Sequence, residues 1–85
     1  MSAQMRRASV SIASNIAEGA ARQGDKEFIQ FLHIALGSAA ELETQLVIAR
    51  DVGLAKPSDV DAVDKGLAQL RQLLLGLIRS IKASP

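Results

Sequence analysis

The stretch QMRRASVSIASNIAEG, residues 4–19, decides the fold class, because a helix built from it lacks the broad polar face that a surface helix turns toward solvent. At 100° per residue, apolar side chains share one face and small residues share a second face roughly opposite, with a polar stripe between them. The apolar face holds Met5, Ala8, Ile12, Ile16 and Gly19, the small-residue face holds Val10, Ala13, Ala17 and Ala21, and the polar stripe holds Arg7, Ser11, Asn15, Glu18 and Arg22. We therefore expect this helix to be buried in a larger assembly.

Composition points to a small protein that associates with copies of itself. The 85 residues allow one domain, residues 1–85, and a chain of this size buries only about 60–65% of its unfolded surface. Because 48% of the residues are hydrophobic, a lone copy would expose large apolar patches, which usually mark interfaces. We expect a homo-oligomer.

Several classes of protein are disfavoured by the same composition. There is no cysteine for a disulfide or a thiolate metal site, and Phe28 and Phe31 are the only aromatic residues, so stacking platforms for single-stranded nucleic acid are missing. The net charge of +1 argues neither for nor against nucleic acid. No signal peptide or membrane-spanning run is recognisable, and we expect a soluble, cytoplasmic protein without membrane contact.

The remaining pattern predicts three helices, at residues 2–23, 26–52 and 58–82. Ser2 is a good N-cap, Gly24 is expected to close the first helix in the left-handed conformation, and Asp25 to cap the second. The second helix is apolar nearly all round and should end at Gly53. Ser58 and Asp61 resemble a capping box for the third helix. Short connections between three such helices indicate an all-α, antiparallel up-and-down bundle.

The sequence resembles the bacterial 23S rRNA-intervening sequence protein family, also called the four helix bundle protein family. The resemblance rests on motifs that occur in order and cover roughly residues 4–53. These motifs are residues 4–8, 14–19, 27–28, 31–32, 34–38 and 41–46.

This resemblance implies a four-helix, up-and-down bundle that assembles into a ring, with a homopentamer as the expected state. It implies no established enzymatic activity. Some relatives are encoded inside insertions within ribosomal RNA genes, and a structurally similar group serves as an accessory to reverse transcriptases. Both contexts suggest structured RNA or a ribonucleoprotein as a partner.

One departure from the family concerns the beginning of the chain. Members usually carry an additional amphipathic helix before the element that is residues 4–7 here. We expect either a start further upstream, or a shortened member whose vacated groove is filled by a neighbouring subunit.

The concentrated basic residues are the candidate nucleic-acid contacts: Arg6, Arg7, Arg22 and Lys26. The first two lie at one end of the first helical hairpin and the last two at the other, which predicts two patches. In a ring, copies of even a small patch would multiply. The alternative is an ion-paired role, in which Glu18 binds Arg22 four residues later and Arg7 binds an acid on a neighbouring helix.

Asn15 and Glu18 are predicted to form a structural polar network, since an unpaired polar group beside an apolar face costs about 1–3 kcal/mol. The expected partners are Ser11, Arg7, Arg22 and Thr44. A catalytic carboxylate is the weaker alternative, because no nucleophile or base lies nearby in sequence.

No metal or cofactor site is expected. His33 is the sole histidine, and the Glu-x-x-His motif of bundle metal sites does not occur. Gly19 and Gly24 lack the partner residues of a phosphate-binding loop.

These patterns favour a non-enzymatic, oligomeric adaptor that engages structured RNA or a ribonucleoprotein through basic residues at one rim. The alternative is a protein-only scaffold that holds a partner helix against spare apolar surface such as Leu75 and the vacated groove. An enzyme acting on a small molecule is the least favoured reading.

Overall fold

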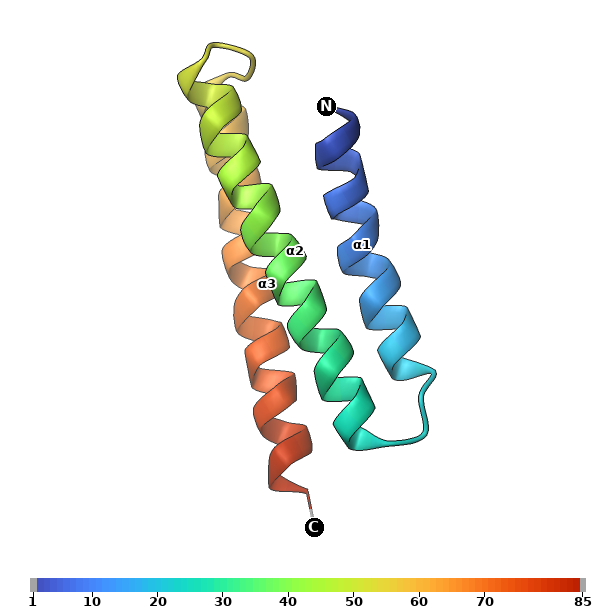
Figure 1. Cartoon of the computed structure of the whole chain (residues 1–85). Helices are drawn as coiled ribbons and strands as arrows, with labels where there is room; N and C mark the ends of the chain where they lie inside the picture. The colour runs from blue at the N-terminus through green and yellow to red at the C-terminus, as the bar shows by residue number, and fades with distance from the viewer. Residues whose placement is uncertain (1, 85) are drawn as a thin grey trace.

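The computed structural model describes residues 2–84 as three helices that run up and down beside one another (Figure 1). They are α1 (Ala3–Ala20), α2 (Asp25–Asp51) and α3 (Pro57–Ala83). α2 contacts both other helices, whereas no Cα atom of α1 lies within 8 Å of one in α3. The molecule measures 49 × 21 × 13 Å. The expected all-α class is confirmed, and none of the helices within the described range is long and apolar enough to cross a membrane.

The first hairpin differs from the expectation at its turn. Ser2 is the N-cap, and its hydroxyl accepts a hydrogen bond of 3.1 Å from the Met5 amide. The helix ends at Ala20 instead of residue 23, because its last turn tightens and the Arg22 amide donates to the Gly19 carbonyl, three residues back. Gly24 has an extended conformation with φ of −105° and is the N-cap of α2, so the left-handed ending and the Asp25 cap were both wrong.

The second connection combines a correct and an incorrect prediction. Gly53 has a φ of 81°, with its amide bonded to the Arg50 carbonyl and the next amide bonded to the Ala49 carbonyl. This is the Schellman pattern, which satisfies carbonyls that the helix end leaves free. α3 then begins at Pro57, whose fixed φ suits the first helical position. Its N-cap is Lys56 without a side-chain hydrogen bond, so the predicted capping box was wrong.

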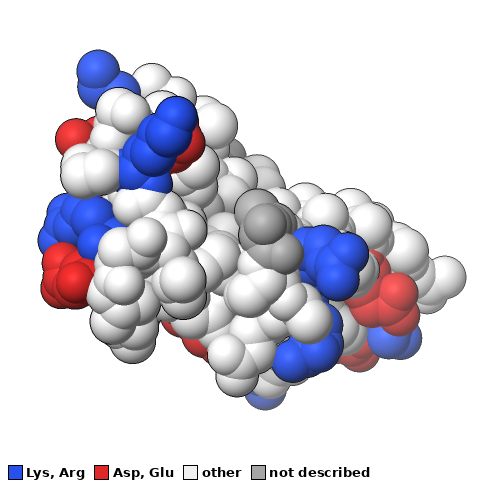
Figure 2. All heavy atoms as spheres, turned by 90° about the horizontal axis from the view of Figure 1, so that it is seen from above, with Lys and Arg blue, Asp and Glu red and all other residues white. Residues whose placement is uncertain are grey.

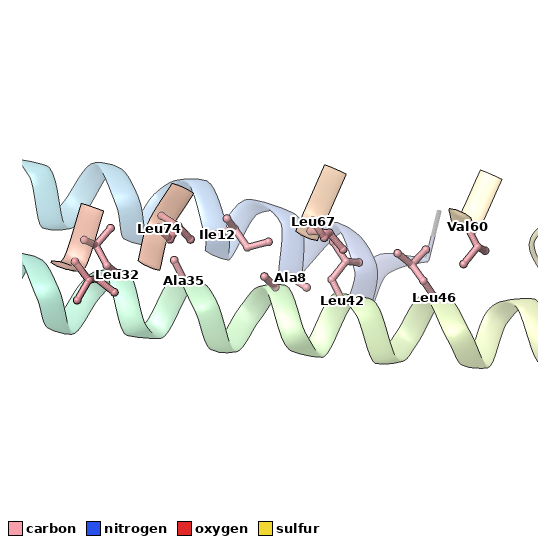
Figure 3. Close-up of a cluster of buried hydrophobic side chains, with 11 residues drawn as sticks. Ala8, Ile12, Leu32, Ala35, Leu42, Leu46, Val60, Leu67 and Leu74 are labelled. Carbon is pink, nitrogen blue, oxygen red and sulfur yellow. The ribbon is translucent and has the colours of Figure 1, made fainter. Parts of the chain in front are cut away.

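The core is one cluster along α2, to which α1 and α3 each contribute a stripe (Figure 3). Leu32, Ala35 and Ala39 of α2 have no exposed surface. Around them lie buried side chains of all three helices: Ala8, Ile12, Leu42, Leu46, Val60, Leu67, Leu74 and Ile78. The three helices are therefore held together by a thin aliphatic core that runs along α2.

Candidate interaction surfaces

Arg22 is engaged within its own chain. Its guanidinium lies 2.9 Å from Glu18 and 3.9 Å from Glu27, and its Cζ lies 5.2 Å from the centre of the Phe31 ring. These are the geometries of an i,i+4 ion pair and a cation–π contact. A nucleic-acid phosphate would have to compete with these partners, which weakens the case for Arg22 as a contact.

Arg6 and Arg7 are different, because within residues 2–84 no acidic group lies within 4.0 Å of either. The acid on a neighbouring helix that we expected for Arg7 is not found. Both arginines line a shallow depression on the outer side of α1, together with Ala3, Val10 and Ser11. Val10 is 63% exposed there. This surface combines two basic side chains with the apolar side chains of Ala3 and Val10.

The four basic candidates do not form one patch. Lys26 has no ion pair among the described residues and begins α2, at the end of the molecule opposite Arg6 and Arg7. Arg7 lies near the start of α1 and Arg22 in the turn after it, and the part of the helix from Arg7 to Ala20 spans about 20 Å. Seen from the end where α1 starts, the lysine and arginine side chains are scattered among uncharged and acidic side chains (Figure 2).

Asn15 and Glu18 belong to separate groups and do not share one network. Asn15 Nδ2 donates to the Ser11 carbonyl at 2.7 Å and to Ser11 Oγ at 3.1 Å. Ser11 Oγ in turn lies 2.8 Å from Oγ of Ser38, which is almost fully buried on α2. Glu18 instead accepts from Arg22 at the surface. The serine pair thus fixes α1 against α2, whereas Glu18 is solvated.

Two features of α3 were missed by the sequence reasoning. Arg71 forms an ion pair with Glu43 of α2, which no local spacing could reveal because it depends on how the helices align. At the start of α3, Asp61 and Asp64 line a second shallow depression with Ala62 and Lys65. Both carboxylates lack an ion pair in the described part of the chain, and the buried Oδ1 of Asp64 accepts no hydrogen bond.

The surface also carries much apolar area. Among the described residues, ten large hydrophobic side chains are at least 37% exposed, and they come from all three helices and the second connection. They are Val10, Ile34, Val47, Ile48, Val52, Leu54, Val63, Leu73, Leu75 and Leu77. Such a surface is typical of a protein that is covered by other chains.

Residues 2–84 contain no candidate metal site. No three histidine, cysteine or carboxylate groups lie close enough to hold a metal ion. His33 is exposed on α2 and is not part of any such group. The features that stand out are surfaces suited to binding.

Fold and surface together define a small all-α bundle protein with exposed apolar faces. The sequence pattern of the 23S rRNA-intervening sequence protein family matches residues 1–76, and the chain belongs to this family. A comparison with curated proteins gave no match for the chain.

Proposed function

We propose that the protein is a non-enzymatic, self-associating helical scaffold. The observation that carries this proposal is the exposed apolar surface, above all on α2, which packs against two helices and still exposes Ile34 and Ile48 by 50% and 57%. Burying such side chains contributes about 25 cal/mol per Å² of apolar surface removed from water. Copies of the same chain are the simplest source of that cover, and the homopentamer implied by the family resemblance is one such assembly.

The test is the absolute mass in solution, measured by light scattering on a sizing column over a wide range of concentration. We expect a mass of several chains that decreases on dilution; five chains would match the family expectation. A monomer that persists at high concentration would refute the proposal.

Engagement of structured RNA is the second candidate function, favoured by the unpaired Arg6 and Arg7. Against it stand the engaged Arg22, the separation of the basic groups and the net charge of +1. Pull-down from lysate with and without nuclease distinguishes the two. Partners that survive nuclease support a protein scaffold, and partners lost on digestion support RNA.

A further inference from the structure

The two outer helices carry opposite charges at the same end of the molecule. α1 and α3 both begin at the end shown at the top of Figure 1, so they run in the same direction. Arg6 and Arg7 are the fourth and fifth residues of α1, and Asp61 and Asp64 are the fifth and eighth residues of α3. In the core close-up, Leu67, three residues after Asp64, is level with Ala8 of α1, whereas Val60, just before Asp61, lies further along, beyond Leu46 of α2 (Figure 3).

Within residues 2–84, neither group is neutralised by an ion pair. The helix dipole accounts for Asp59 in the first turn of α3, but its effect falls off beyond that turn, where Asp61 and Asp64 lie. Lys65 lines the same depression without coming within 4.0 Å of either carboxylate. A basic surface and an acidic surface therefore remain available for a partner.

The residues that follow the charged groups on α1 and α3 have the same spacing, and their sizes are complementary. On α1, Val10 comes four residues after Arg6, and Ala17 comes seven residues later. On α3, Ala68 comes four residues after Asp64, and Leu75 again comes seven residues later. Spacings of four and seven keep each series on one helix face. Side by side, the two series place the larger Val10 against Ala68 and the larger Leu75 against Ala17, as ridge and groove packing requires.

We propose that the α1 face of one copy, formed by Arg6, Arg7, Val10 and Ala17, binds the α3 face of a second copy, formed by Asp61, Asp64, Ala68 and Leu75. The proposal rests on the self-association proposed above and names the surfaces that carry it. The two helices run in the same direction, because the opposite orientation would bring Arg6 toward Arg79 and Lys82 near the end of α3. Different surfaces meet in this contact, so a pair of copies keeps one free α3 face and one free α1 face, and the assembly extends into a ring or a filament.

This contact is tested by reversing the charges on each face separately and then on both faces together, which restores opposite charges across the contact. The variants are Arg6→Glu/Arg7→Glu, Asp61→Arg/Asp64→Arg, and the chain that combines all four changes. We expect each double variant to associate about tenfold more weakly than the wild type at low salt, an effect that 1 M salt diminishes by screening. The four-fold variant should recover association, because the opposite charges face each other again with their signs exchanged. Lys26→Glu/Lys82→Glu, which matches the arginine variant in net charge and lies at the other end of the molecule, should leave association unchanged.

The outcomes separate this contact from the broader proposal. Helix content, measured by circular dichroism, must be retained in every variant for the comparison to count; a double variant that unfolds is replaced by Arg6→Gln/Arg7→Gln or Asp61→Asn/Asp64→Asn. A wild-type oligomer that is insensitive to both double changes overturns the contact and leaves the scaffold intact. Loss of binding to a structured RNA probe in the arginine variant, with association unchanged, assigns Arg6 and Arg7 to phosphate and also overturns it. A wild-type protein that is monomeric would refute the proposal that the protein is a self-associating scaffold.

Discussion

Gly19 is the residue at which α1 and α2 depend on the absence of a side chain. A Cβ atom at this position would lie 2.7 Å from Cβ of Phe31 and 2.9 Å from Cδ1 of Phe28. We predict that Gly19→Ala lowers the free energy of unfolding by about 1–3 kcal/mol, because the first hairpin must open to admit the methyl group. Chemical denaturation monitored by circular dichroism measures this change.

Gly37→Ala is the matched control, since a Cβ atom there meets nothing within 4 Å in the middle of α2. It should raise stability by about 0.5–1 kcal/mol through helix propensity. Equal effects of the two substitutions would show that the close approach at Gly19 has no energetic consequence.

The polar residues of the first hairpin show which side-chain contacts can be predicted from the sequence and which cannot. Asn15 to Ser11 and Arg22 to Glu18 are contacts between residues four positions apart in the sequence, and both are among the pairs that the sequence predicts. The bond from Ser11 to Ser38 spans 27 residues and could not be inferred, because it depends on the alignment of α1 with α2.

At the scale of the elements, the ends of the helices separate local from tertiary control. Gly53 was correctly predicted to end α2, since its φ of 81° is a conformation that costs other residues energy. Gly24 looked similar in sequence but became an extended N-cap. The two glycines differ in the direction that the following helix takes relative to the preceding one, and the sequence around either glycine does not determine this direction.

We predict that Gly53→Ala destabilises the protein by about 1 kcal/mol, because alanine is strained at positive φ while the Schellman bonds require that conformation. Thermal unfolding monitored by circular dichroism provides the measurement. Gly66→Ala, inside α3 where a Cβ atom meets nothing within 4 Å, should instead stabilise it. A Gly53→Ala protein as stable as the wild type would argue against the strained cap.

At the scale of the whole molecule, stability should depend on assembly. Three helices joined by one thin seam leave ten large apolar side chains exposed in the described part of the chain, so association removes apolar surface that folding alone does not. We predict that Tm rises by several degrees over a hundredfold increase in protein concentration, since binding of folded chains to one another stabilises them by mass action. A Tm that does not change with concentration, measured by calorimetry, would contradict this prediction.

The sequence by itself determined the all-α class, the number of helices, the beginning of the first and the end of the second, and the apolar stripe of α1. These follow from periodicity and capping, which act between residues a few positions apart. Only the tertiary structure decided that Arg6 and Arg7 have no acidic partner within residues 2–84, that Arg71 pairs with Glu43, and that Ser11 bonds to Ser38. The physical reason is that these relations depend on the alignment of whole helices, which the packing of the shared core fixes and no short stretch of sequence encodes.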